Sequence, residues 1–137
     1  MREIKFRGKR VNAGKWVYGC LILCSYGAFI KDTEDKHTNP RQIDGFHKTA
    51  DFRCVEVDPA TIGQFTGKTV KTGKVFDGDI GESIDGRFLV VWDEGKAAFV
   101  MRFYDGSGDA LYLEEIWDNA KIIGDIHSNP SLLEATP

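Results

Sequence analysis

Aspartate–glycine pairs divide the second half of this chain into short apolar runs, and their spacing constrains the fold more than any other feature. Asp85-Gly86 separates residues 80–84 from residues 87–92, and Asp105-Gly106 follows the run 97–104. Such dipeptides accept the backbone angles that tight hairpin turns impose. Short runs between turns of this kind predict an antiparallel meander.

The rest of the chain continues this alternation of extended runs and turns. Residues 3–7 alternate charged and apolar side chains, as a half-buried strand does. Apolar spacing over residues 111–117 and the pair Asn129-Pro130 favour two short helical segments, with Asn129 as a helix cap. Further strands are expected at residues 16–18, 21–23, 28–30, 52–57 and 121–127, and turns at 12–14, 25–27 and 71–74.

The sequence therefore predicts a mainly β protein with one or two short helices. Its 137 residues are enough for one compact domain. Residues 61–137 are expected to form a small antiparallel, SH3-like barrel. Residues 1–60 should pack on this barrel as additional strands, because about sixty residues form only a marginal core alone. The expected core residues of the barrel are Ile80, Phe88, Val90, Trp92, Phe99 and Met101.

Residues 31–49 form a polar stretch that is long for a connection between strands. It is either a mobile surface excursion or a functional loop.

Neither the termini nor the cysteines indicate export. No run approaches the ~20 apolar residues of a membrane span, and the N-terminus has no apolar signal region, so we expect a cytoplasmic protein. The three cysteines, Cys20, Cys24 and Cys54, are expected to be buried or incidental thiols. A zinc site built with His37 or His47 is the alternative, although the usual ligand spacing is absent.

Catalytic motifs fail at positions that they require. Gly67-Lys68-Thr69 resembles the end of a phosphate-binding loop, but Ile62 stands where the first glycine is needed. The acidic runs that begin at Asp77 and Asp105 lack the glycine and the terminal glutamate of a calcium loop. We therefore predict no catalytic residue, no cofactor and no metal ion, and expect a non-catalytic binding or assembly module. A hydrolase that uses His37 or His47 is the lowest-ranked alternative.

Two groups of cations among aromatic residues support a different function, the binding of single-stranded nucleic acid. Small barrels bind such strands with aromatic rings placed among positive charges. The net charge of −3 gives no overall basic field, and lysines at hairpin edges also serve to discourage edge-to-edge pairing. The candidate contacts are Lys5, Phe6, Arg7, Trp16, Lys68, Lys71 and Lys74.

Residues 97–101 carry no charge, and the aromatic Phe103 and Tyr104 follow closely. This is more apolar surface than one side of a small barrel hides, so Phe103, Tyr104 and Tyr112 are candidates for a subunit interface of a homo-oligomer. In the alternative, the segment near Leu113, Ile116 and Trp117 covers the same face within one chain.

Several blocks of the sequence together resemble the YopX-like proteins, small products of bacteriophages and prophages. The strongest match runs from Val57-Asp58-Pro59 through residues 60–67 and resumes over 73–80; residues 3–7, 16–19 and 122–133 match as well. The family usually has Tyr-Glu-Gly-Asp at residues 76–79 and Gly-Asn at 124–125. The resemblance implies a phage or prophage origin, a bacterial cytoplasmic location, homo-oligomers and an unknown phage or host partner. It brings no established activity and no catalytic residue.

Two Gly-Asp pairs lie within the matching blocks. Gly78 and Gly124 are of the type that tight turns or close backbone approach demand. Asp79 and Asp125 are expected to accept backbone N–H groups and so to fasten those turns.

Overall fold

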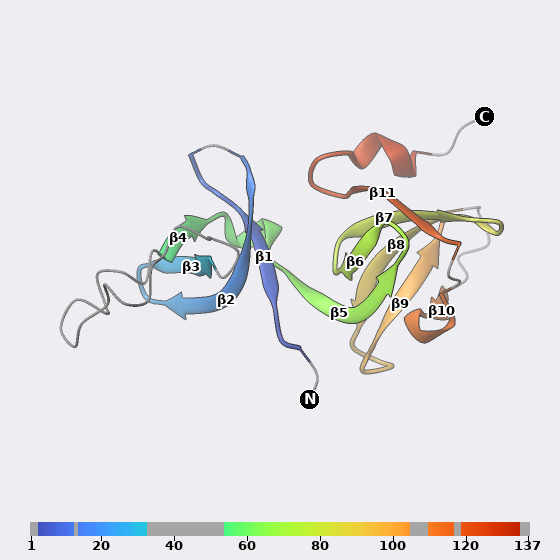
Figure 1. Cartoon of the computed structure of the whole chain (residues 1–137), viewed down its shortest axis with the longest axis horizontal. Coiled ribbons are helices and arrows are strands. Elements are labelled where there is room, and N and C mark those ends of the chain that lie inside the picture. The colour runs from blue at the N-terminus through green and yellow to red at the C-terminus, as the bar shows by residue number, and fades with distance from the viewer. Residues whose placement is uncertain (1–2, 13, 33–53, 105–109, 117–118, 135–137) are drawn as a thin grey trace. The chain divides into compact units, whose positions relative to one another are not determined.

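The computed structural model describes residues 3–12, 14–32, 54–104, 110–116 and 119–134 (Figure 1). Antiparallel strands dominate these residues and form two sheets, so the predicted mainly β fold is confirmed. The helical segments in this part of the chain are short 3-10 turns, and none has the length and hydropathy that a membrane span requires. Residues 33–49 of the polar stretch, with His37 and His47, lie outside the described residues.

The first sheet has six strands in the order β4-β3-β2-β1-β5-β6. Its hairpins are those expected from the sequence, including the turn at Lys71 and Thr72, where Val70 pairs with Gly73. Strands β1 and β4, the first and the last strand within residues 1–60, are both short. The strands are β1 (Phe6–Lys9), β2 (Trp16–Cys24), β3 (Gly27–Asp32), β4 (Cys54–Val57), β5 (Gly63–Val70) and β6 (Gly73–Phe76).

The second sheet has five strands in the order β10-β9-β8-β7-β11, and the consecutive strands β7, β8 and β9 confirm the predicted meander. The hairpin near Asp85 forms, but its turn occupies Ile84 and Asp85, because Gly86 already pairs with Ser83. The Asp105-Gly106 turn lies outside the described residues. The strands are β7 (Asp79–Ser83), β8 (Gly86–Asp93), β9 (Ala98–Phe103), β10 (Ala110–Tyr112) and β11 (Lys121–Asp125).

Strand β10 lies where helical spacing was expected. Residues Ala110–Tyr112 pair with β9 instead of forming a helix, and within the described part of this segment only η4 (Leu113–Glu115) is helical. Near the C-terminus the expected short helix is the 3-10 turn η5 (Pro130–Leu133). Asn129 occupies the N-cap position and Pro130 the first turn, as expected, but the Asn129 side chain does not bond to the turn: its oxygen accepts the backbone N–H of Asp125 at 3.3 Å.

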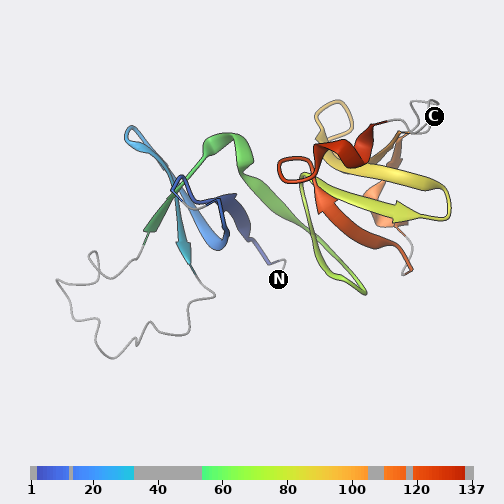
Figure 2. The same cartoon turned by 90° about the horizontal axis from the view of Figure 1, so that it is seen from above.

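The chain divides into two compact units, each shown from two directions in Figures 1 and 2. The N-terminal unit is Ile4–Gln64, and the C-terminal unit contains Phe65–Pro137 together with Glu3. Strand β5 begins in the first unit and continues in the second. That the N-terminal strands pack on the barrel-like part stays a prediction.

The N-terminal unit has a small aliphatic core. Gly8 permits β1 to approach it closely, since a Cβ at this position would lie 2.9 Å from the Cβ of Val57. The 3-10 turn η3 (Pro59–Thr61) fixes the end of the unit, where the Thr61 hydroxyl accepts the N–H of Lys9 at 2.9 Å. The buried core residues are Val17, Ala28, Ile30 and Val57.

The three cysteines are free and exposed, so of the expected alternatives, buried or incidental thiols, burial was wrong. Cys20 and Cys54 both lie opposite Lys31 in the strand register, whereas the neighbouring Ile30 points into the core. Alternation along the strands therefore turns these thiols outward. Among the described residues, no three His, Cys, Asp or Glu side chains are placed to hold one metal ion.

The C-terminal unit has a larger core that contains aromatic rings. The rings of Phe88 and Phe103 lie 5.6 Å apart, and Gly81 makes room for Phe88. The expected core residues Ile80, Phe88, Val90 and Met101 are buried, but Trp92 was wrong, with 47% of its surface exposed. Its cross-strand partner Phe99, also expected in the core, is partly buried and packs against the cluster, whereas Trp92 lies one step beyond it. The cluster comprises Val70, Val75, Phe88, Val90, Met101, Phe103, Leu113 and Ala120.

The two Gly-Asp pairs perform the structural role expected of them. A carboxylate oxygen of the buried Asp79 accepts the N–H of Phe76 at 2.7 Å. Asp125 accepts the N–H groups of His127 and Ser128 at 3.0 and 2.8 Å. The two aspartates are register partners on β7 and β11, so both turns are fastened at the same place in the sheet.

Candidate functional site

In the N-terminal unit the predicted nucleic-acid contact Arg7, together with Lys9 of the same strand, lies against a second predicted contact, the Trp16 ring. The ring is therefore already in contact with cations of the chain itself. Lys9 pairs with Trp16 across β1 and β2, and its ammonium lies 5.3 Å from the Trp16 ring centre. The guanidinium carbon of the buried Arg7 lies 4.4 Å from the same ring. Phe6 packs against the aliphatic core, and Lys5 is half-buried beside it in the sequence. These rings are therefore engaged in internal cation–π and core contacts.

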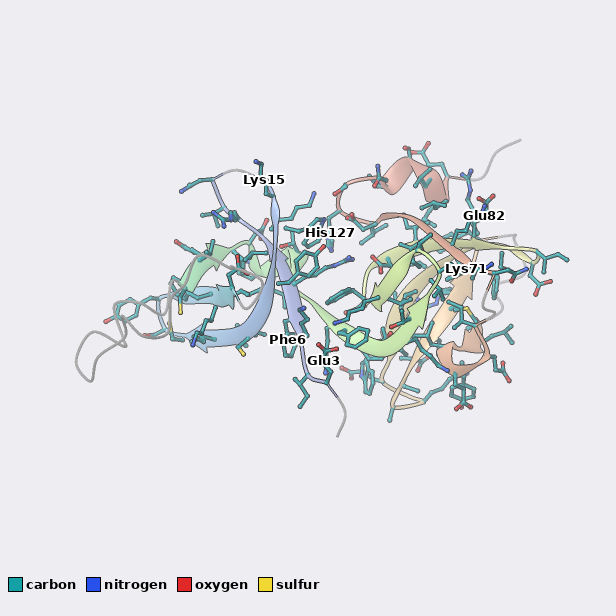
Figure 3. The ribbon with its side chains drawn as sticks, in the orientation of Figure 1. Glu3, Phe6, Lys15, Lys71, Glu82 and His127 are labelled. Atoms are coloured by element: carbon teal, nitrogen blue, oxygen red, sulfur yellow. The ribbon has the colours of Figure 1, made fainter. Side chains whose placement is uncertain are left out.

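In the C-terminal unit the predicted lysines do not form one group. Lys71 stands exposed at the β5–β6 turn (Figure 3). Lys74 lies 5.3 Å from the centre of the Phe65 ring and 3.0 Å from the Glu3 carboxylate. Phe65 is 5% exposed, so its ring is not available for stacking a base. Lys68, in contrast, lines a pocket.

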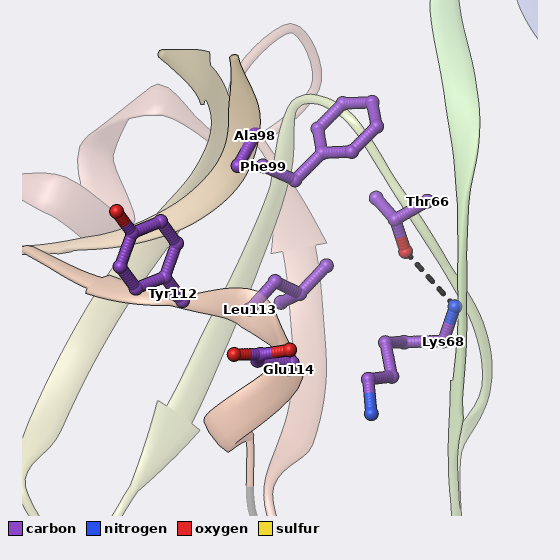
Figure 4. Close-up of a pocket in the computed structure, with 7 residues that line it drawn as sticks. All are labelled: Thr66, Lys68, Ala98, Phe99, Tyr112, Leu113 and Glu114. Carbon is purple, nitrogen blue, oxygen red and sulfur yellow. Dashed lines mark hydrogen bonds between the residues drawn. The ribbon is translucent and has the colours of Figure 1, made fainter. Parts of the chain in front are cut away.

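That pocket, of ≈ 350 Å³, lies between β5 on one side and β9 and η4 on the other (Figure 4). All of its lining residues belong to the C-terminal unit. Apolar side chains and residues of both charges line it: Thr66, Lys68, Ala98, Phe99, Tyr112, Leu113 and Glu114.

The pocket exists because β10 is shorter than β9. Pairing between these strands ends where Tyr112 meets Val100, so no described strand flanks Ala98 and Phe99 on that side. After Tyr112 the chain turns into η4, and the Leu113 side chain enters the core with 3% of its surface exposed. The floor of the pocket is thus part of the core itself.

The wall formed by β5 has an interrupted ladder. Its register with β6 shifts between Phe65 and Thr69. Within this interruption the Thr66 hydroxyl donates to the carbonyl of Val75 at 2.8 Å and accepts the N–H of Lys68 at 3.2 Å (Figure 4). The Thr66 hydroxyl therefore takes the place of ladder hydrogen bonds at this interruption. It also holds the backbone N–H of Lys68 and so helps to set the direction of the Lys68 side chain.

Opposite charges face each other across the pocket. Figure 4 shows the Lys68 ammonium and the Glu114 carboxylate near one end, with the Phe99 ring and the Thr66 methyl toward the other. Within the described part of the chain, neither charged group has an ion-pair partner. The pocket therefore offers one hydrogen-bond donor and one acceptor, both charged, beside an apolar floor.

Two aromatic residues and one strained residue line the pocket or adjoin its lining residues. Trp92 packs edge-on against Phe99 with ring centres 5.1 Å apart, and Tyr112 is 44% exposed. Lys96 places its ammonium 5.8 Å from the Tyr112 ring centre. Ala97, with φ of +50°, holds a left-handed conformation that alanine rarely adopts. Strain of this kind concentrates at functional sites.

The predicted interface residues lie in two different environments. Phe103 is buried against Phe88 and belongs to the core, whereas Tyr104 is 42% exposed. Leu113 and Ile116 pack on the core cluster, as the intrachain alternative expected, and Trp117 lies outside the described residues. Self-association through Tyr104 and Tyr112 stays a prediction.

Comparison with protein families decides which family this chain belongs to. The model of the family described as YopX protein matches residues 5–134. The chain belongs to the YopX family. This confirms the resemblance read from the sequence, and all pocket residues of the YopX chain lie within the match. No curated protein matches the chain.

Sequence reasoning missed the pocket of this YopX protein. Its walls come from residues 66–68, 98–99 and 112–114, which are separated by more than the length of any local motif. The one available signal was the uncharged run 97–101, which was interpreted as a subunit interface.

Proposed function

We propose that this YopX-family chain is a non-catalytic binding module that holds a segment of another protein in the pocket between β5, β9 and η4. The observation that carries the proposal is the combination of an apolar floor with the charges of Lys68 and Glu114, neither of which has an ion-pair partner among the described residues. Binding sites typically join apolar surface with a few placed polar groups that fix orientation.

The size and chemistry of the pocket favour a polypeptide. At ≈ 350 Å³ it lies at the small end of the range of about 300–1,000 Å³ for ligand sites, which suits a few residues of a chain. A peptide presents N–H and C=O groups side by side, and Glu114 and Lys68 offer the complementary acceptor and donor. Phe99 and Leu113 would contact its apolar side chains.

The hydrogen bonds of the Thr66 hydroxyl favour a binding role for the pocket over a catalytic one. Thr66 donates to one backbone group and accepts from another, so it is not free to act as a nucleophile. A nucleophile needs an adjacent base within hydrogen-bond reach, and the Thr66 hydroxyl donates to the carbonyl of Val75 rather than to a base. The phage or prophage origin that the resemblance to YopX-like proteins implies supports a partner from a phage or its bacterial host, and a cytoplasmic location.

Selection from a displayed library of random 12-residue peptides on the full chain tests this function. We expect selected peptides to bind about tenfold or more weakly to the Lys68→Gln, Glu114→Gln double variant, since hydrogen bonds to charged groups are among the stronger ones. Lys71→Gln, an exposed lysine outside the pocket, is the matched control and should change affinity less than twofold. Failure to select any peptide, or equal binding by both variants, would overturn the proposal.

Single-stranded nucleic-acid binding is the second candidate, and the gathering of Arg7 and Lys9 at Trp16 is the observation that favours it. Because these cations are already engaged with the ring, binding would rest on phosphate contacts alone. Retention of an oligothymidylate that falls steeply with added salt would favour this candidate.

A further inference from the structure

The pocket lies between strands β5 and β9, and beyond Val100 no described strand pairs with the outer side of β9, which indicates the conformation of its occupant. We infer that the bound segment lies extended and adds a strand beside Ala98 and Phe99, in the space that β10 leaves free. This inference rests on the proposed function and specifies how the partner is recognised.

Strand β9 supplies the edge. Its register with β10 runs from Arg102 opposite Ala110 to Val100 opposite Tyr112 and then stops. Ala98 and Phe99 still belong to β9 and pair with β8 on their inner side. Because backbone groups alternate in direction along a strand, one of these two residues directs its N–H and C=O outward, toward the pocket. An unpaired edge of this kind is a template for an added strand.

Strand β5 forms the opposite boundary. Over Thr66–Lys68 its ladder with β6 is interrupted, and the Thr66 hydroxyl takes over two of the hydrogen bonds. A segment between β5 and β9 would thus lie between two strands rather than on an open face. The Lys68 ammonium would donate to a carbonyl of the segment, and the Glu114 carboxylate would accept one of its N–H groups.

The occupant's side chains should then alternate. In an added strand every second side chain points to the same face, so one set would contact Phe99 and Leu113 while the other faces away. Recognition by main-chain groups is tolerant of sequence, whereas the apolar floor selects apolar residues at alternate positions. We therefore expect selected peptides to share a period of two in hydrophobicity.

A scan of single N-methyl substitutions along one selected 12-residue peptide tests the inference, with binding to the full chain as the readout. Each methyl group removes one N–H donor. We expect a loss of tenfold or more at the position whose N–H meets the outward carbonyl of Ala98 or Phe99 and at the position whose N–H meets Glu114, with little change at the other positions. A second readout is hydrogen exchange of the protein, in which the outward amide of Ala98 or Phe99 should slow on binding, while that of Arg102 should not.

The outcomes separate the two proposals. If peptides bind through Lys68 and Glu114 but no N-methyl position other than the one at Glu114 loses affinity, the added strand is wrong and the binding function stands. If the selected peptides are helical when bound, the added strand is likewise wrong. If no peptide is selected, both the function and the strand are overturned.

Discussion

The two units of the chain use aromatic and basic side chains in different ways. In the N-terminal unit Arg7 and Lys9 lie against the Trp16 ring and form cation–π contacts with it. In the C-terminal unit Trp92 and Tyr112 are nearly half exposed beside a pocket whose lysine has no ion-pair partner among the described residues. Cations interleaved with aromatics in a sequence therefore do not say whether a ring is available to a ligand.

The buried cores of the two units also differ in composition. Four aliphatic or small residues form the buried cluster of the N-terminal unit, whereas that of the C-terminal unit includes Phe88, Phe103 and Met101. Strand β9 and η4, which carry part of the pocket, supply Met101, Phe103 and Leu113 to the larger cluster. The predictions that follow test this contrast.

The largest effect is expected from Phe88→Ala in the C-terminal unit. Phe88 is fully buried, and removing such a ring costs about 3–5 kcal/mol of unfolding free energy. Amide hydrogen exchange should accelerate in β7, β8 and β9 and stay unchanged in β2 and β3. Equal acceleration in both units would show that they unfold together and would break the comparison.

Adding one methyl group at a crowded glycine should cost less. In Gly81→Ala the new Cβ would overlap the Phe88 ring, being 2.6 Å from its Cε2 atom, and overpacking costs about 1–3 kcal/mol. Gly8→Ala is the matched change in the N-terminal unit, where the Cβ would meet Val57. Urea denaturation should measure each loss of unfolding free energy, and amide hydrogen exchange should show that the loss is confined to the unit that carries the substitution. If neither substitution changes the unfolding free energy, the close approaches at Gly81 and Gly8 are contradicted.

Much of the fold could be predicted because its signals are local. The meander, the hairpin turns and the roles of Asp79 and Asp125 all follow from residues close together in the sequence. Alternation also placed Trp92 on the correct face of β8. It could not show where the packed cluster ends, so it did not show that Trp92 is exposed.

The candidate site could not be predicted because it depends on where strands stop. The pocket exists because β10 ends two residues short of β9, which is decided by pairing rather than by composition. Likewise, exposure of Cys20 and Cys54 follows from the register with Lys31, a relation that is absent from the sequence pattern.

Lys9→Met should have a smaller effect and be confined to the N-terminal unit. Removing the ammonium 5.3 Å from the Trp16 ring is expected to cost about 0.5–1 kcal/mol, the range for cation–π pairs at partly exposed sites. Lys15→Met, at the exposed turn before Trp16, is the control and should be near neutral. If the two variants have the same unfolding free energy by denaturant titration, the pairing of Lys9 with Trp16 carries no stability.

The smallest effect, with the opposite sign, is expected from Ala97→Gly beside the pocket. Left-handed alanine costs about 1–2 kcal/mol, and glycine's extra backbone entropy offsets part of the relief, so a gain of about 0.5 kcal/mol remains. The urea midpoint should rise. A fall in the midpoint would mean that the turn before β9 is not strained.

The most direct test of the peptide site is an NMR titration of the ¹⁵N-labelled full chain with a peptide selected from the random 12-residue library. We predict the largest amide shift changes at residues 66–68, 98–99 and 112–114, the three segments that form the pocket. Residues 5–9 and 16–18, around the self-satisfied Trp16, should change little. Shift changes concentrated on β1 and β2, with the pocket amides unmoved, would contradict the account.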